Sequence, residues 1–219
     1  NFNSEVSYDA DGETPFRFGS FTTMGEFYVE TGLNIIGMSD YKRILSLDSA
    51  MAVVQFKKDH VAYQRNYFIS YPANVMVMRF SADQPGKQNL VFSYAPNPVS
   101  TGNMASDGNK GLVYSASLDN NGMKYVVRIQ AETKGGTLSN ADGKLAVKGA
   151  DEVVFYITAD TDYKPNFDPD FKDPKTYVGS DPEQTTRKTM EGAIRKGYDE
   201  LYRAHEADYT SLFNRVSYN

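Results

Sequence analysis

Short segments rich in β-branched and aromatic residues follow one another along most of this chain, and Gly, Asp, Asn or Ser separates each from the next. Such segments between turn-forming residues are typical of β-strands. The predicted strands cover residues 24–30, 41–48, 51–57, 60–71, 75–80, 90–94, 111–118, 123–131 and 153–158, with further short strands between 135 and 151. Roughly ten or more strands exceed what one open sheet usually holds without splitting or curling. We therefore predict an all-β fold, a large antiparallel β-sandwich in which two sheets enclose one main core.

Two details indicate how these strands are arranged. In the segment 75–80, the valines fall on one face and the methionines and Phe80 on the other, so both faces are apolar. Such a strand is expected to lie centrally and to be covered on both sides. Residues 119–122 read Asp-Asn-Asn-Gly, which predicts a hairpin turn because Asn and Gly tolerate a positive φ.

One long helical pattern follows a proline-rich stretch near the carboxyl end. Prolines between residues 160 and 182 exclude regular ladders and predict a long loop there. Asp181 or Ser180 can cap a helix that has Pro182 in its first turn, and a kink is expected at Gly197. The apolar positions of this helix that recur every three or four residues are Met190, Ile194, Tyr198, Leu201 and Tyr202.

The chain is expected to be one module of a larger protein. Residues 1–180 are predicted to form the sandwich domain and residues 181–219 a helical linker. Within that linker, residues 205–219 are expected to be an apolar connector that leads to another domain. A β-rich domain that ends in a helix and a connector is more typical of one part of an assembly than of a complete enzyme.

Charge and composition exclude several classes of partner. A net charge of −5 argues against binding to a phosphate backbone, which requires a clustered basic surface, so no nucleic-acid partner is expected. Cysteine is absent and there are only two histidines, so we predict no disulfide, no metal site and no cofactor. No run of 18 apolar residues and no signal-like start occurs, so no membrane partner is expected.

Acidic residues offer candidate sites, but none has the spacing of a known motif. Calcium could bind to carboxylates of the 160–182 loop, although their spacing lacks an ordered ligand pattern and a solvated loop is favoured. Asp9, Asp11 and Gly12 resemble half of a calcium loop. The carboxylates considered in the longer loop are Asp160, Asp162, Asp168, Asp170 and Asp173.

A glycosidase needs a pair of carboxyl groups, and Glu26, Glu30 and Asp48 lie on predicted strands. Charges that face outward from strands explain these three residues more simply. No nucleophile elbow, phosphate loop, dinucleotide fingerprint or His-Glu-x-x-His pattern is present. The sequence therefore predicts no catalytic residues in this chain, and it does not identify substrate-binding residues.

Aromatic residues are numerous, with 16 Tyr and 13 Phe. Exposed aromatic faces can stack on sugar rings, but packing in a core or interface is the favoured interpretation for both groups considered. His60 and His205 are expected to be structural, and His205 could cap the end of the helix. The two aromatic groups are Phe16, Phe18, Phe21, Phe27 and Tyr28 near the start, and Tyr163, Phe167, Phe171 and Tyr177 in the long loop.

Several segments, taken together and in order, resemble the amino-terminal domain of glycoside hydrolase family 95. The resemblance covers about residue 16 to the end of the chain. An early strand pair with a Gly-Asn-Gly stretch, which usually opens the family domain, is not evident before Phe16. The matching segments are residues 18–29, 40–50, 61–71 and 75–79, and then 197–201 and 205–216, which match the family's junction with its next domain.

The resemblance implies a β-sandwich of the supersandwich type, followed in the parent protein by an (α/α)6 barrel that holds the catalytic residues. Family members are mostly inverting, exo-acting α-L-fucosidases, with α-L-galactosidases among their relatives. The implied partners are the parent's own C-terminal catalytic domain and, through the parent enzyme, a fucosylated glycan. The resemblance also implies a periplasmic or extracellular location, and this chain alone is expected to be inactive.

The helix and connector are expected to dock onto that catalytic barrel. Two alternatives stay open from the sequence: a self-sufficient carbohydrate-binding module that uses the aromatic groups, and a purely structural, adhesin-like sandwich. The residues predicted to make the docking contacts are Tyr198, Leu201, Tyr209, Leu212 and Phe213.

Overall fold

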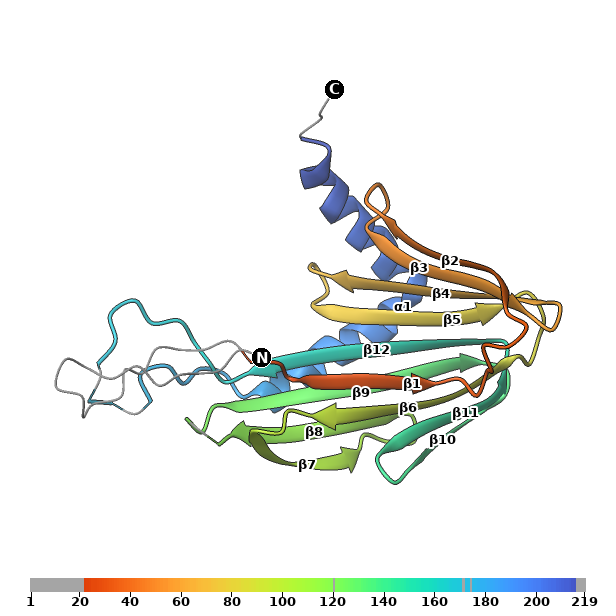
Figure 1. Cartoon of the computed structure of the whole chain (residues 1–219). Coiled ribbons are helices and arrows are strands. Elements are labelled where there is room, and N and C mark those ends of the chain that lie inside the picture. The colour runs from red at the N-terminus through yellow and green to blue at the C-terminus, as the bar shows by residue number, and fades with distance from the viewer. Residues whose placement is uncertain (1–21, 120, 171, 174, 216–219) are drawn as a thin grey trace.

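The computed structural model describes residues 22–215 except 120, 171 and 174. Within these residues it shows two antiparallel sheets and one long helix (Figure 1). The strands are β1 (Gly25–Glu30), β2 (Ser39–Ser46), β3 (Met51–Lys58), β4 (Val61–Ser70), β5 (Val75–Ala82), β6 (Gln88–Pro96), β7 (Ser100–Ser106), β8 (Gly111–Leu118), β9 (Lys124–Lys134), β10 (Thr137–Ala141), β11 (Lys144–Ala150) and β12 (Glu152–Thr161), and the helix is α1 (Pro182–Phe213).

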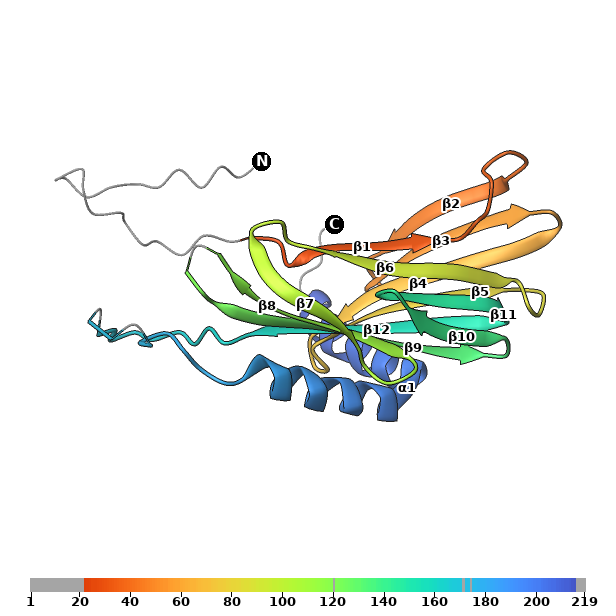
Figure 2. The ribbon, with the colours of Figure 1, turned by 90° about the horizontal axis from the view of Figure 1, so that it is seen from below.

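The two sheets differ in size. The smaller sheet has four strands in the order β1-β6-β11-β10, and the larger has eight in the order β2-β3-β4-β5-β12-β9-β8-β7. Seen from below, the small sheet lies on one face of the large sheet and α1 lies on the other (Figure 2). The all-β sandwich predicted from the strand pattern is therefore confirmed, with the helix as a third layer.

The main core lies between the sheets. Phe92 of β6, Phe155 of β12 and Ile129 of β9 are each fully buried there, and the rings of Phe92 and Phe155 stack with their centroids 4.7 Å apart. Alternate residues of each strand point inward, so this layer follows directly from the two-residue period of a strand.

Strand β5 shows why the large sheet is covered on both faces. Val75 and Val77 belong to the cluster beneath α1, whereas Met78 and Phe80 belong to the core between the sheets. The predicted central strand is confirmed, because its apolar residues on one face pack against the helix and those on the other against the small sheet.

Most predicted strands are present with small differences at their ends. The 119–122 turn joins β8 to β9, where Gly122 has a φ of 72° and its amide donates to the Leu118 carbonyl. Asp48 lies in the turn after β2 and not on a strand. Strand β7 was not predicted, because Ser-Thr-Gly-Asn-Met-Ala-Ser has few residues that favour strands. It forms only as an edge strand paired with β8.

The helix is longer than the sequence pattern indicates. It begins at Pro182 as predicted, but it continues through Phe213, so residues 205–213 belong to the helix and do not follow it as expected. In this last part of the helix, Thr210 donates from Oγ1 to the Glu206 carbonyl at 2.7 Å. Residues 216–219 of the predicted connector lie outside the described residues, as do residues 1–21.

Candidate interdomain docking surface

The start of α1 is fixed by local chemistry. Asp181 has an extended backbone, and its carboxylate accepts a hydrogen bond from the Glu183 amide at 3.0 Å. Pro182 in the first turn needs no partner for an amide hydrogen, and its side chain is buried against the sheet. The predicted cap and first turn are therefore confirmed, with Asp181 as the capping residue.

A buried arginine anchors this first turn to the sheet. Arg128 of β9 is 1% exposed, and its guanidinium binds the Asp107 carboxylate at 2.6 Å and the Glu183 carboxylate. Glu183 also pairs with Arg187 one turn later at 3.0 Å. A buried arginine requires such partners, because an uncompensated charge in this position would be strongly destabilising.

Gly197 divides α1 into two segments. Its φ of 70° and ψ of 174° interrupt the helix, as the sequence predicts. Tyr198, the next residue, receives a hydrogen bond from the Asn66 side chain at 3.1 Å, and the Arg79 guanidinium lies 4.7 Å from the centre of its ring. Contacts of Tyr198 with β4 and β5 thus hold the helix at its kink.

The second segment of α1 crosses the outer face of the large sheet. Leu201 is fully buried in the cluster that also contains Met51 and Phe68. The His205 ring stacks on Phe68 with centroids 5.0 Å apart, and His205 Nε2 donates to the Ala50 carbonyl at 2.8 Å. His205 is structural, as expected, but it does not cap the helix, because the helix continues two turns beyond it.

The five predicted docking residues fall into two groups. Leu201 is 0% exposed and Tyr198 is partly buried, and both pack against the chain's own sheet. Leu201 therefore offers no surface to another domain in this arrangement. Leu212 and Phe213 are 57% and 38% exposed, and Tyr209, which is partly buried, stacks on Phe213 with centroids 5.2 Å apart. These three residues lie in the last two turns of α1, whose place is seen in Figure 1.

The carboxylates of the 160–182 loop hold local structure. Asp162 accepts from the Lys124 amide, and Asp170 and Asp173 each accept from the amide two residues later. Asp160 accepts from the Thr185 hydroxyl of α1, and the carboxylate of Asp168 accepts no hydrogen bond from the residues that the structure describes. The described residues contain no group of three or more His, Cys, Asp or Glu side chains able to hold a metal ion. Asp9 and Asp11 lie outside the described residues.

The remaining carboxylate and histidine candidates are surface residues. Glu26 and Glu30 are exposed and alternate with the inward-facing Phe27 and Val29 of β1. Glu26 accepts a hydrogen bond from the Tyr28 hydroxyl, which raises the pKa of Tyr28. His60 is exposed in the β3–β4 turn. Outward-facing strand charges therefore account for Glu26 and Glu30, and Asp48 is exposed as well.

The aromatic candidates differ in exposure. Phe27 packs against the main core, whereas Tyr28 is 47% exposed. In the long loop, Tyr163 is 54% exposed and its ring stacks on Tyr177 with centroids 5.9 Å apart, and Phe167 is 99% exposed. Phe16, Phe18, Phe21 and Phe171 are outside the described residues.

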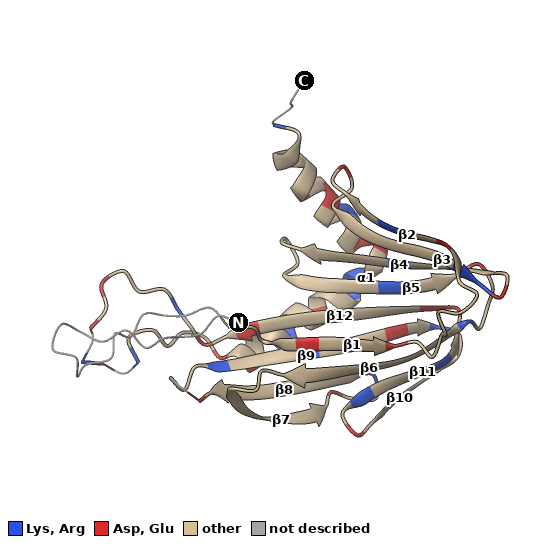
Figure 3. Cartoon of the chain, in the orientation of Figure 1, with Lys and Arg blue, Asp and Glu red and all other residues tan. Residues whose placement is uncertain are grey.

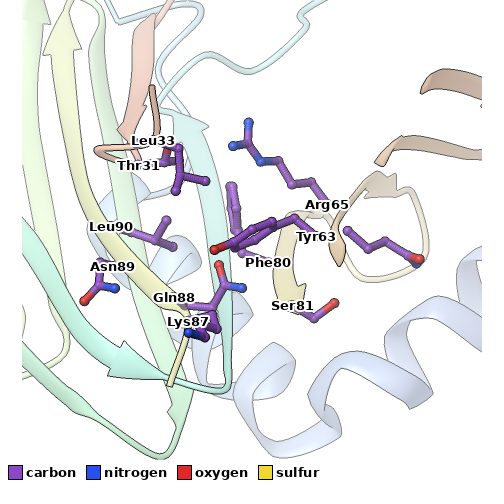
Figure 4. Close-up of a pocket in the computed structure, with 11 residues that line it drawn as sticks. Thr31, Leu33, Tyr63, Arg65, Phe80, Ser81, Lys87, Gln88, Asn89 and Leu90 are labelled. Carbon is purple, nitrogen blue, oxygen red and sulfur yellow. The ribbon is translucent and has the colours of Figure 1, made fainter. Parts of the chain in front are cut away.

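The hollows among the described residues differ in size, and one of about 520 Å³ is lined by residues that include Asp40, Lys57 and Asp83. Figure 4 shows the lining of a cavity of about 10 Å³ between the sheets, which has room for about one water molecule. Gln88 lines it and has a buried Nε2 with no hydrogen-bond partner among the described residues, which one water could satisfy. A groove of about 300 Å³ beside α1 is lined by Arg128, Gln130 and side chains of the helix.

Charges are interspersed over the described chain. Figure 3 shows Lys and Arg scattered among Asp and Glu on both sheets and on α1. In the described part of the chain, no helix is long and apolar enough to cross a membrane. Among the predicted sites, the end of α1 combines exposed apolar side chains, Leu212 and Phe213, with a defined stacking contact of Phe213 on Tyr209.

Comparison with known proteins shows the family of this chain. The family model described as "Glycosyl hydrolase family 65, N-terminal domain" matches residues 4–166, which is most of the chain. The chain belongs to this family. The resemblance found in the sequence, to the N-terminal domain of a glycoside hydrolase, is confirmed at the level of this domain family.

Curated relatives of this glycoside hydrolase domain are fungal and plant α-fucosidases. "Probable alpha-fucosidase A" of Aspergillus niger is 28% identical over 94% of this chain and 26% of its own length. "Alpha-L-fucosidase 2" of Arabidopsis thaliana is 28% identical over 82% of this chain and 23% of its own length. The chain thus spans about a quarter of the length of the curated relatives it matches.

A solved structure shows the same fold. The "Putative kojibiose phosphorylase from human microbiome" aligns with a TM-score of 0.57 over 86% of this chain and 27% of its own length. Its sequence is only 9% identical, so the likeness concerns the fold alone.

Proposed function

We propose that this chain is the non-catalytic N-terminal domain of an exo-acting, inverting α-L-fucosidase that releases terminal α-linked L-fucose from glycans. The observation that carries the proposal is the match to α-fucosidases over 94% and 82% of the chain. The surface chemistry is consistent with a supporting role, because the carboxylates considered for catalysis are exposed strand or turn residues.

The proposed partner of the domain is the catalytic domain of its own parent protein, an (α/α)6 barrel by family resemblance. Tyr209, Leu212 and Phe213 at the end of α1 are proposed to pack against it, since exposed apolar side chains that gather on one surface are typical of interfaces. Tyr198 and Leu201 have a different proposed role. They hold α1 on the sandwich, so the exposed end of the helix is presented in a fixed direction.

Fucose release tests the proposed activity. A 2′-fucosylated oligosaccharide is incubated with this chain alone and with the full-length parent, and L-fucose is measured. We expect release by the parent only, with β-L-fucose as the first anomer seen by NMR if the enzyme inverts. A matched α-L-galactoside tests the alternative specificity. Release by this chain alone would contradict the non-catalytic assignment, and no release by the parent would contradict the fucosidase assignment.

One observation favours a second function, binding of carbohydrate by the domain itself. The stacked Tyr163–Tyr177 pair and the exposed Phe167 present aromatic faces on one loop, and such faces pack against sugar rings. Titration of this chain with fucosylated glycans, followed by NMR, tests this function. Shifts confined to this loop would support it, and unchanged spectra would exclude it.

The proposed location of the parent is the periplasm or the extracellular space, supported only by the family resemblance. Immunodetection of the full-length protein in separated cellular fractions and in the medium would test this proposal.

A further inference from the structure

The turn between β2 and β3 lies on the same side of the molecule as the second segment of α1 (Figure 1). Leu47 in this turn is 54% exposed, and Ile44 of β2 is 44% exposed. Ile44 pairs in register with Val53, a residue packed against the cluster beneath the helix, so Ile44 faces the helix side of the sheet. The exposed apolar surface of this corner therefore has contributions from a hairpin as well as from a helix.

Two hydrogen bonds attach this turn to α1. His205 Nε2 donates to the Ala50 carbonyl at 2.8 Å, and the Tyr202 hydroxyl donates to the Ser49 carbonyl at 3.3 Å. These bonds join residues more than 150 positions apart in the sequence. The turn and the second segment of α1 are thus held together, and Leu47 has a fixed position relative to the end of the helix.

From this geometry we infer that the β2–β3 turn is a second docking element, and that Leu47 and Ile44 contact the same catalytic domain as Leu212 and Phe213. This inference rests on the proposed function. The partner is the remaining part of the parent polypeptide, because the relatives are about four times as long as the matched region. Its docking face is expected to be apolar, since the corner offers leucine, isoleucine and aromatic side chains.

The attachment of the β2–β3 turn to α1 is the main argument that both contact a single partner. An interface usually has an apolar centre in which neighbouring side chains exclude water together. The end of α1 offers the exposed Leu212 and Phe213, and the turn, which is hydrogen-bonded to Tyr202 and His205 of the same helix, offers the exposed Leu47. One rigid corner built from two elements also limits how the helix can pivot on the partner, so the turn is expected to fix the orientation of the two domains.

Cysteine labelling tests the inference, and the chain suits this method because it contains no cysteine. Single variants Leu47→Cys, Leu212→Cys and Lys110→Cys are made in this chain and in the full-length parent. Lys110 is the control, because it is exposed beside β7, at the opposite edge of the large sheet from β2. Maleimide attachment is followed by peptide mass spectrometry, so cysteines elsewhere in the parent do not interfere. Circular dichroism checks that each variant is folded.

We expect Leu47→Cys and Leu212→Cys to react about tenfold or more slowly in the parent than in this chain, while Lys110→Cys reacts equally in both. Fast labelling of Leu47→Cys in the parent, with Leu212→Cys protected, would overturn the inference and leave helix docking intact. Fast labelling at both positions would overturn the proposed docking itself. Fucose release by the same variants reports separately on the proposed activity.

Discussion

At the scale of single residues, burial decides the behaviour of groups that look alike in the sequence. Tyr156 of β12 is 1% exposed beneath α1, and its hydroxyl donates to the Glu132 carboxylate at 2.9 Å. Burial, followed by the nearby Glu132 charge, raises the pKa of Tyr156 well above its ordinary value. Tyr71 is 86% exposed on the surface.

The raised pKa of Tyr156 predicts that the folded chain loses stability at alkaline pH. Above a pH of about 10 the unfolded chain releases the Tyr156 proton while the folded chain retains it, so the free energy of unfolding falls as pH rises. Tyr156→Phe removes this contribution, and its stability should therefore fall less steeply. At neutral pH the variant should be about 1 kcal/mol less stable, because the hydrogen bond is lost.

Urea unfolding of the wild type and of Tyr156→Phe at neutral and alkaline pH measures both effects. Tyr71→Phe, at a tyrosine that is 86% exposed, is the control for the removal of a hydroxyl group at the surface. Equal slopes for the wild type and Tyr156→Phe would contradict the proposed cause.

Substitution of two leucines of α1 distinguishes a residue that packs within this chain from one that is proposed to dock. Leu201→Ala should lower the free energy of unfolding of this chain by about 2–5 kcal/mol, since Leu201 is fully buried. Leu212→Ala should change it by less than about 0.5 kcal/mol, since Leu212 is 57% exposed. Urea unfolding measures both variants. Similar losses would show that Leu212 also packs within this chain.

At the scale of elements, the kink in α1 depends on one glycine. The φ of 70° and ψ of 174° at Gly197 belong to a region that is essentially restricted to glycine. Gly192, five residues earlier, has ordinary helical geometry, and an added Cβ there would have no atom within 4 Å. The same helix therefore offers a matched pair of positions.

Gly197→Ala should destabilise the chain by about 1–3 kcal/mol through backbone strain alone, because an added Cβ at Gly197 also meets no neighbouring atom within 4 Å. Gly192→Ala should stabilise it by about 0.5–1 kcal/mol by favouring the helical state. Thermal and urea unfolding measure both changes. Stabilisation by both substitutions would mean that α1 straightens at Gly197 without cost.

At the scale of the whole molecule, α1 joins the sandwich to the corner proposed to dock. The first segment is anchored through Arg128, and the second is held by Leu201 and His205. Both segments lie on one sheet, and the second is also hydrogen-bonded to the β2–β3 turn. The domain is therefore suited to hold a neighbouring domain in a fixed orientation.

The sequence by itself determined the strand segments, the start and kink of α1, and the family. These features depend on residues close together in the chain: the two-residue alternation of strands, the Asp181 cap before Pro182, and a glycine at 197. They could be predicted because local periodicity and turn chemistry require no knowledge of distant contacts.

Only the tertiary structure decided which candidate docking residues are free. Leu201 and Leu212 share one helix and one residue type, yet one is 0% and the other 57% exposed. The difference arises because β3 and β4 lie beneath the first residue and not beneath the second. Likewise, His205 binds a carbonyl 155 residues away, and weakly strand-forming β7 exists only beside β8. Such contacts depend on how distant segments meet, which local patterns do not encode.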